Sequence, residues 1–298
     1  AGVYALSAFD NTCRVTLASG KEGSTPQVLK IEPKIDDFKL ENHLIAKNIR
    51  SDSAYFYGAP FDNVRYLYGA VPLNKERFII KGDIPNPPLF IATELSKKLK
   101  LKGIVVDNAP FVIFSTTTKP RKVLYVNYSR KLTEIVKEIN HRSNNLYAEH
   151  LLKYLALKSV EQATLNRAIY IVENHWRKQG LSTDGLFLFD GSGLSPKNAI
   201  SPMFFVKLLC LMTKSSEFEN FYTSLRIAGK SGTVSSFLLG SSLAGNIRLK
   251  SGSFGQVQCY VGYLSKKYAF AVMVNNFSCS RKTVLREIEY FLENAILQ

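Results

Sequence analysis

Short apolar or alternating runs, separated by Gly, Pro, Asn and Asp, make up most of the first 120 residues. This pattern is typical of β-strands joined by turns. The strands it predicts are residues 15–17, 28–31, 54–57, 77–81 and 104–106, and residues 3–6 with 13–17 are typical of a hairpin already in progress. One helix interrupts them, since Pro87 and Pro88 can begin a helix, Gly103 can end it, and apolar residues recur between them at helical spacing. We therefore expect a small β-rich domain over residues 1–120, with residues 115–120 as its exit.

The pattern changes to longer amphipathic helices after about residue 130. The predicted helices are residues 132–139, 146–156, 163–179, 202–213 and 283–297, and the fewer predicted strands are 186–189, 247–250, 257–264 and 268–274. A tight turn at 265–267 joins the last two strands, and alternation in 257–261 gives a strand with one core face. We expect a second domain over residues 121–298, with helices packed on an antiparallel sheet in an α/β (α+β) fold.

The formal charge of +15 is high for 298 residues. Its carriers are spread in short pairs, so a diffuse positive field suits any polyanion, including nucleic acid, an acidic membrane surface or an anionic cell-wall polymer. It is equally consistent with a solubility device. The chain has no basic-aromatic motif of a recognised nucleic-acid module, so a nucleic-acid partner is the weaker hypothesis.

Residues that commonly bind metals are scattered along the chain. Cys13, Cys210, Cys259 and Cys279 stand far apart and the four His residues form no ligand array, so we expect neither a metal nor a cofactor. Cys210 lies in an apolar helical run and Cys259 in a strand run, which predicts small core residues. The cysteines do not decide the redox compartment or any pairing. No stretch approaches the length of a membrane helix, so no integral membrane segment is expected.

Candidate chemistry begins with Lys250-Ser251-Gly252-Ser253. A strand that binds an acyl substrate needs a cation for the substrate carboxylate, a hydroxyl beside it, and a Gly that lets ligand backbone approach. The next residue then offers its N–H to a developing oxyanion. A second copy, Lys230-Ser231-Gly232, shows that the tripeptide alone is a weak signal. Because Lys250 ends a strand run and leads into a hairpin, we favour Lys250.

Ser143-Asn144-Asn145 lies between two predicted helices, where a loop can direct polar side chains into a cleft. All three residues are also preferred at helix starts, so a helix cap is the competing interpretation. The two roles can coexist, because one side chain can cap the helix while another stays free.

The third candidate is the loop Asp190-Gly191-Ser192-Gly193-Leu194-Ser195, which follows a short apolar strand. Its glycines permit positive φ and its Asp and Ser can bond the turn internally, so a structural loop is the default interpretation. The spacing differs from the G-x-S-x-G nucleophile elbow.

Taken in order, these motifs resemble the DacB-like class C low-molecular-mass penicillin-binding proteins. The ordered set is S-x-N followed by L-Y-A-E (residues 143–149), D-G-S-G-L-S (190–195), A-G-x-x-G-T (228–233) and K-[ST]-G-S (250–253). The resemblance covers about residues 130–298, and residues 1–120 resemble more loosely the β-rich insertion of that family. Ser251 stands where Thr is commoner, and Lys230 stands in a loop that is usually more acidic.

The resemblance implies a penicillin-recognising serine transpeptidase/β-lactamase-like fold and a D-alanyl-D-alanine carboxypeptidase or endopeptidase that acts on peptidoglycan through an acyl-serine intermediate. It implies proton relay by Ser143, a hydrogen bond from Asn145 to the acyl-side amide, binding of the terminal carboxylate by Lys250 and Ser251, close approach at Gly252, and an oxyanion donor at the Ser253 N–H. The implied partners are peptidoglycan stem peptides and β-lactams, and the implied location is periplasmic or otherwise extracytoplasmic.

The nucleophilic Ser-x-x-Lys motif of this family occurs nowhere in the chain; Thr116 to Lys119 has the spacing but the wrong first residue. In the family pattern the motif precedes the inserted domain. We therefore expect an incomplete catalytic domain, inactive alone, whose export signal also lies upstream. The alternative is a nucleophile-free homologue that binds stem peptides or scaffolds cell-wall enzymes. Carboxypeptidase and endopeptidase preference, and oligomeric state, stay open.

Overall fold

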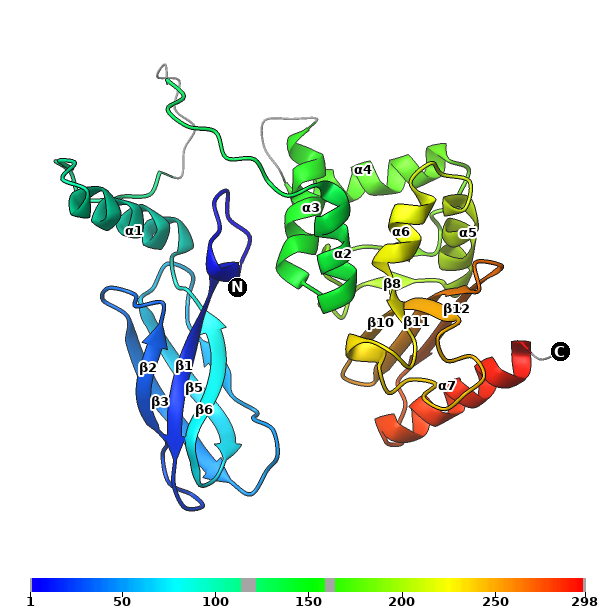
Figure 1. Ribbon diagram of the computed structural model, residues 1–298, viewed down its shortest axis with the longest axis horizontal. Coiled ribbons are helices and arrows are strands. Elements are labelled where there is room, and N and C mark those ends of the chain that lie inside the picture. The colour runs from blue at the N-terminus through cyan, green and yellow to red at the C-terminus, as the bar shows by residue number, and fades with distance from the viewer. Residues whose placement is uncertain (1, 114–121, 159–163, 297–298) are drawn as a thin grey trace. The chain divides into compact units, whose positions relative to one another are not determined.

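The computed structural model describes residues 2–113, 122–158 and 164–296 and divides the chain into two compact units, Ala1–Val123 and Leu124–Gln298 (Figure 1). The residues expected to form the exit from the first domain, 115–120, lie outside the described ranges. Within those ranges, no helix combines the length and the hydropathy needed to cross a membrane.

The first unit contains two three-stranded sheets. One has the order β2-β1-β6 and is antiparallel; the other has the order β3-β5-β4, with β3 parallel and β4 antiparallel to β5. The strands are β1 (Thr12–Ser19), β2 (Gln27–Glu32), β3 (Lys39–Lys47), β4 (Tyr55–Tyr57), β5 (Val64–Pro72) and β6 (Lys75–Asp83). Four of them fall on predicted strands, whereas β3 and β5 were not predicted.

Both sheets contribute to one core. Val15 and Leu17 of β1 share a buried cluster with Leu44 of β3 and Leu67 of β5. Helix α1 (Pro87–Leu101) adds Phe90 to this cluster. It begins at the predicted prolines, and the side chain of Asn86 caps it by accepting a hydrogen bond from the Leu89 N–H at 3.1 Å. The helix predicted here is confirmed.

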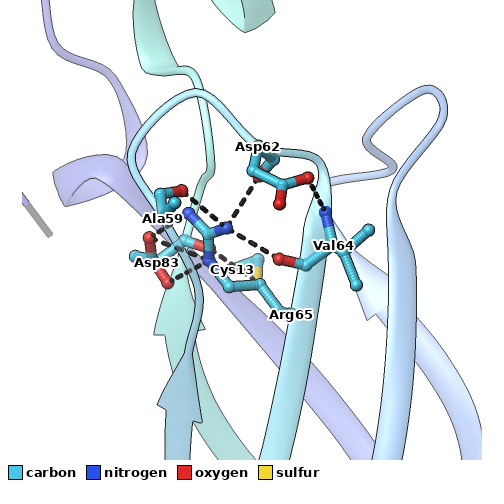
Figure 2. A network of polar contacts seen from close by, with 6 residues as sticks. All are labelled: Cys13, Ala59, Asp62, Val64, Arg65 and Asp83. Atoms are coloured by element: carbon cyan, nitrogen blue, oxygen red, sulfur yellow. Dashed lines mark hydrogen bonds and ion pairs between the residues drawn. The ribbon is translucent and has the colours of Figure 1, made fainter.

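A buried arginine joins two strands of the first unit (Figure 2). The Arg65 side chain on β5 is 2% exposed and donates to both carboxylate oxygens of Asp83 on β6, at 2.8 to 3.2 Å. Its Nη1 also donates to the carbonyls of Ala59, Asp62 and Val64. Burial and the nearby Asp83 raise the pKa of the Cys13 thiol to about 11, so this thiol stays protonated. The network thus connects β5 to β6 and to the loop that precedes β5.

The second unit is built on the antiparallel sheet β12-β11-β10-β9, with a separate pair formed by β7 (Leu186–Phe187) and β8 (Ala199–Ile200). The strands of the larger sheet are β9 (Arg226–Ile227), β10 (Ile247–Phe254), β11 (Val257–Leu264) and β12 (Tyr268–Asn275). The helices are α2 (Leu132–Arg142), α3 (Asn145–Leu157), α4 (Leu165–Lys178), α5 (Pro202–Met212), α6 (Phe218–Ser224) and α7 (Arg281–Ile296).

Helices cover both faces of this sheet. On one face, Leu249 and Tyr260 pack with Val284 and Ile288 of α7. On the other face, Tyr263 packs with Leu209 of α5 and with residues of α6. The prediction that residues 257–261 have one core face is therefore wrong, because both faces of β11 are covered; within this stretch Gln258 and Tyr260 are the buried residues. Helices on an antiparallel sheet confirm the expected α+β class.

Three other sequence-based expectations are wrong. Residues 3–6 form no strand, and residues 104–106 leave α1 as an exposed coil whose Ile104 N–H bonds back to the Leu99 carbonyl at 3.1 Å. Apolar runs of three or four residues without a partner strand have nowhere to place their backbone hydrogen bonds except water. Cys210 is exposed instead of buried. Nearly every position of α5 is apolar, so the sequence could not show that the face bearing Leu209 turns inward.

Candidate active site

A two-residue connection between α2 and α3 carries the S-x-N motif. Ser143 adopts a left-handed conformation (φ 52°, ψ 49°) that ends α2, and Asn144 begins α3. The Asn144 side chain caps α3 by accepting a hydrogen bond from the Tyr147 N–H at 3.0 Å. The capping interpretation therefore applies to Asn144, and the side chains of Ser143 and Asn145 line a cavity instead.

The K-[ST]-G motif lies on β10, opposite this connection. The Lys250 Nζ donates a hydrogen bond to the Ser143 Oγ at 2.8 Å and also bonds the Ser251 carbonyl. The Ser251 hydroxyl lies 3.4 Å from the Thr233 hydroxyl. A Cβ added at Gly252 would meet only the Cys259 Cβ, at 3.9 Å, so this part of the strand is open to a ligand.

All six residues expected at the site line one cavity of about 510 Å³. Its complete lining is Ser143, Asn145, Ser192, Gly193, Leu194, Thr233, Lys250, Ser251, Gly252, Ser253, Gln258, Tyr260, Arg281 and Leu285. Two of these side chains are cationic and none is acidic, so the cavity favours an anionic group. Segments up to 142 residues apart in sequence thus meet in one place.

The Asp190 loop forms one wall of this cavity, and α3 holds it there. The Glu149 Oε1 accepts hydrogen bonds from the N–H groups of Gly191 and Ser192, both at 3.0 Å. Inside the loop, the Asp190 carboxylate accepts from the N–H groups of Gly193 and Ser195 at 2.6 and 2.5 Å. The loop is therefore both an internally bonded turn, as expected from its composition, and a wall of the site.

Arg226 on β9 supports the end of α2, next to Ser143. Its Nε bonds the His141 carbonyl, two residues before Ser143. Its guanidinium fills the space where a side chain at Gly232 would lie, because a Cβ there would come within 1.8 Å of the Arg226 Cζ. Gly232 begins the short 3-10 turn Gly232–Val234, which places Thr233 beside Ser251. Arg226 thus links the S-x-N connection to the A-G-x-x-G-T segment.

The electrostatics of the cavity depend on Lys250. Its pKa lies below the ordinary value of a lysine, first because burial penalises the charged ammonium and then because the positive Arg226 lies nearby. The pKa of His141 is lowered in the same way, by burial and then by Arg226. Arg281 at the start of α7 adds a second cation and donates to the Gly255 carbonyl at 3.1 Å.

One edge of β10 is open beside the cavity. Strand β9 pairs only with Arg248 and Leu249, and in the described parts of the chain no other strand pairs with β10 on that side. From Lys250 to Phe254 the strand therefore presents backbone donors and acceptors next to the motif side chains. An extended peptide can bind such an edge by adding a strand.

The second Lys-Ser-Gly triplet lies elsewhere. Lys230 follows β9 and its Nζ lies against Gly245, 3.0 Å from where a Cβ would be, and it does not line the cavity. The choice of Lys250 over Lys230 from strand context therefore agrees with the geometry. Among residues 2–113, 122–158 and 164–296, no group of three or more His, Cys, Asp or Glu side chains is arranged to hold a metal ion.

The residues of the site that were not predicted include Glu149, Arg226, Gln258 and Arg281. Glu149 belongs to the L-Y-A-E stretch that was used only for recognition, and its capping of a loop 42 positions away has no local signature. Arg226 lies two residues before the A-G-x-x-G-T motif, and that proximity is the one signal that could have indicated it.

Comparisons with known proteins extend over most of the chain. The chain is 25% identical to the D-alanyl-D-alanine carboxypeptidase DacB of Haemophilus influenzae over 225 residues, which cover 73% of this chain and 47% of that protein. It is 30% identical to a D-alanyl-D-alanine carboxypeptidase of an Actinomadura species over 165 residues, covering 53% of this chain and 31% of the relative. The chain thus spans less than half the length of these curated relatives.

The solved structure of penicillin binding protein 4 (dacB) from Haemophilus influenzae, in complex with a β-lactam, matches with a TM-score of 0.81 at 19% identity, covering 98% of this chain and 70% of that one. This likeness confirms the expected fold, that of a penicillin-recognising serine hydrolase with additional sheets. The sequence profile of D-Ala-D-Ala carboxypeptidase 3 (S13) matches residues 1–294. The chain therefore belongs to the D-Ala-D-Ala carboxypeptidase 3 (S13) family.

Proposed function

We propose that this chain forms the substrate-binding and polarising part of a serine-type D-alanyl-D-alanine carboxypeptidase or endopeptidase that acts on peptidoglycan stem peptides. The observation that carries the proposal is the hydrogen bond between Lys250 and Ser143, made inside a cavity that also contains Asn145, Ser251 and Ser253. An acyl-transfer site needs a carboxylate anchor, an amide-binding group and an oxyanion donor close together. The cavity offers all three.

The stem peptide binds as an extended strand along the open edge of β10. Its terminal carboxylate lies against Lys250 and Ser251, and Arg281, the other cation in the cavity lining, adds attraction. The Asn145 amide bonds the peptide group on the acyl side. The N–H of Ser253 faces the scissile carbonyl oxygen, and a donor of this kind contributes about 2.7–4 kcal/mol to transition-state stabilisation.

Ser143 transfers the proton. Because its Oγ accepts a hydrogen bond from Lys250, its own hydroxyl hydrogen is free to point at the leaving nitrogen. A serine outside these 298 residues attacks the scissile carbonyl, the C–N bond breaks, and the terminal D-Ala leaves with the proton delivered through Ser143. Water then hydrolyses the acyl-serine ester and restores the serine.

A protein that cleaves peptidoglycan works outside the cytoplasmic membrane, so we place the activity in an extracytoplasmic compartment. β-Lactams are the inhibitors expected to acylate the complete site, since the matched Haemophilus influenzae protein was solved with one.

A second candidate is a nucleophile-free homologue that binds stem peptides without cleaving them. The absence of Ser-x-x-Lys from these 298 residues is the observation that favours it. The intact mass and the upstream sequence of the native protein separate the two candidates. A segment with Ser-x-x-Lys supports the enzyme, and a native chain without one supports the binder.

The function is tested with this chain alone and with the native protein. This chain should bind diacetyl-Lys-D-Ala-D-Ala without releasing D-Ala and should take up no fluorescent penicillin. The native protein should release D-Ala and become covalently labelled. Covalent labelling of this chain alone would contradict the division of the site, and an absence of peptide binding would contradict the proposal as a whole.

A further inference from the structure

Four tyrosines lie on one face of the sheet β3-β5-β4 in the first unit. Tyr55 pairs with Tyr68, and Tyr57 pairs with Tyr66, across β4 and β5. On the other side of β5, His43 of β3 pairs with Tyr68. Because alternate residues of a strand point to the same face, these five rings lie on one side. We call this set the tyrosine face.

The rings contact one another but are not covered. The four tyrosines are 42% to 63% exposed, whereas Phe56, Leu67 and Leu44 on the opposite side of the same strands pack into the core. The His43 and Tyr68 rings are stacked, with centroids 4.8 Å apart at 11°. The ring centroid of Tyr57 lies 6.0 Å from that of Tyr68 and 6.3 Å from that of Tyr55. Among the residues that the structure describes, the four phenol hydroxyls have no hydrogen-bond partner.

An exposed cluster of large rings of this kind on a folded sheet points to a ligand. Aromatic rings that are fixed by their neighbours bind flat partners at low entropic cost, and the free hydroxyls can each donate and accept. The face thus offers apolar ring surfaces together with polar groups at their rims.

The charges around the face favour an uncharged ligand. On β3 the exposed charged residues of this face are Lys39, Glu41 and Lys47, so the cations stand at the two ends of the strand and the acid stands between them. Glu41 pairs with Tyr66, so it stands on the edge strand β3 beside the rings. A carboxylate at that position repels the phosphates of a nucleic acid, whose binding depends on clustered Lys and Arg. It accepts hydrogen bonds readily from sugar hydroxyls.

We propose that the tyrosine face binds a β-1,4-linked N-acetylhexosamine glycan strand, with the C–H faces of the sugar rings stacked on the tyrosines and Glu41 accepting from sugar hydroxyls. The choice of this polymer rests on the proposed function, because the stem peptides of peptidoglycan are attached to such a strand. The C–H bonds on a pyranose face carry partial positive charge and meet the negative face of an aromatic ring. The first unit thus supplies a second binding site, separate from the cavity of the second unit.

The test uses chitohexaose, an uncharged β-1,4-linked N-acetylglucosamine oligomer, titrated into the full 298-residue chain by calorimetry. The double variant Tyr57→Ala/Tyr68→Ala should bind at least about tenfold more weakly, since it loses two stacking rings. The matched variant Tyr57→Phe/Tyr68→Phe keeps the rings and should stay within about threefold of the parent. Tyr290→Ala removes an equally exposed tyrosine from α7 and should change nothing.

Several results would overturn this inference. The first is that the parent chain does not bind chitohexaose, and the second is that the Ala double variant binds it equally well while unfolding at the same temperature as the parent. The third is that oligo-dT binds at these tyrosines in place of the glycan. The fourth is that the parent sediments as a dimer which the Ala double variant dissociates. Failure of the proposed function is distinguishable. Lys250→Ala should weaken the binding of diacetyl-Lys-D-Ala-D-Ala and leave the binding of chitohexaose unchanged, and Tyr57→Ala/Tyr68→Ala should do the reverse.

Discussion

The Lys250 ammonium donates a 2.8 Å hydrogen bond to the Ser143 hydroxyl, across 107 residues of sequence. The two side chains come from an open-edged strand and from a two-residue helix connection. Neither motif is specific by itself, and their contact gives the site its polarity: a cation behind a hydroxyl, both facing a cavity with no acidic side chain in its lining.

Replacing Lys250 tests the carboxylate anchor. Lys250→Ala should weaken binding of diacetyl-Lys-D-Ala-D-Ala by about 10–150-fold, because a hydrogen bond to a charged group contributes about 1.5–3 kcal/mol. Lys230→Ala, in the second Lys-Ser-Gly triplet, is the matched control and should bind like the parent. Calorimetric titration measures both. Equal weakening by the two variants would mean that the effect is general electrostatic attraction.

Peptide binding should decrease at high pH, with a midpoint below the ordinary pKa of a lysine. Burial and then Arg226 lower the pKa of Lys250, so its ammonium loses its proton earlier than an exposed lysine does. Arg226→Gln should move the midpoint upward, since it removes the neighbouring positive charge. The unfolded chain binds more protons between the two pKa values, so Lys250 also makes stability rise with pH in that window. Dissociation constants measured across pH give the midpoint, and a profile unchanged by Arg226→Gln contradicts this account.

Glu149 should control the order of the Asp190 loop. Glu149→Ala leaves the N–H groups of Gly191 and Ser192 without their acceptor and should cost about 2–3 kcal/mol of unfolding free energy. Glu149→Gln keeps an oxygen acceptor and should cost at most about 1 kcal/mol. Hydrogen exchange at the two amides should speed up in the Ala variant. Unchanged protection there would show that the loop holds itself through Asp190 alone.

Gly232 should tolerate a side chain less well than Gly240. Both residues have positive φ, 55° and 88°, so alanine carries a left-handed strain of about 1–2 kcal/mol at either site. At Gly232 the new Cβ also collides with the Arg226 guanidinium, whereas at Gly240 nothing lies within 4 Å. Measured by urea unfolding, the free energy of unfolding of Gly232→Ala should therefore be at least about 1 kcal/mol lower than that of Gly240→Ala. Equal costs would mean that Arg226 moves aside freely.

The buried ion pair of the first unit should be costly to break. Asp83→Ala leaves the Arg65 side chain, which is 2% exposed, without its carboxylate partner. The variant should lower the free energy of unfolding by about 3–5 kcal/mol. Asp36→Ala breaks the exposed pair with Lys97 in the same unit and should lower the free energy of unfolding far less than Asp83→Ala does. The difference is measured by urea unfolding. Similar small costs for the two variants would show that water reaches Arg65.

Local patterns predicted most of the helices and the site motifs. Asn144 and the paired prolines at 87 and 88 act where they stand, because helix caps and starts depend on residues three or four positions apart. The order of four short motifs indicated the family, and the profile match confirms that family. Local patterns could not predict the parallel pairing of β3 with β5, because the partner of each strand lies about 25 residues away.

The sequence by itself determined the family, the α+β class, and which Lys-Ser-Gly triplet stands on a strand. Only the tertiary structure decided that Glu149 holds the Asp190 loop, that Arg226 supports the Ser143 connection, that Cys210 faces outward, and that four tyrosines share one exposed face. The physical reason is the distance along the sequence over which each kind of interaction acts. Propensity, capping and motif spacing act within a few residues, whereas long-range hydrogen bonds and the choice of the buried face depend on which distant segments pack together.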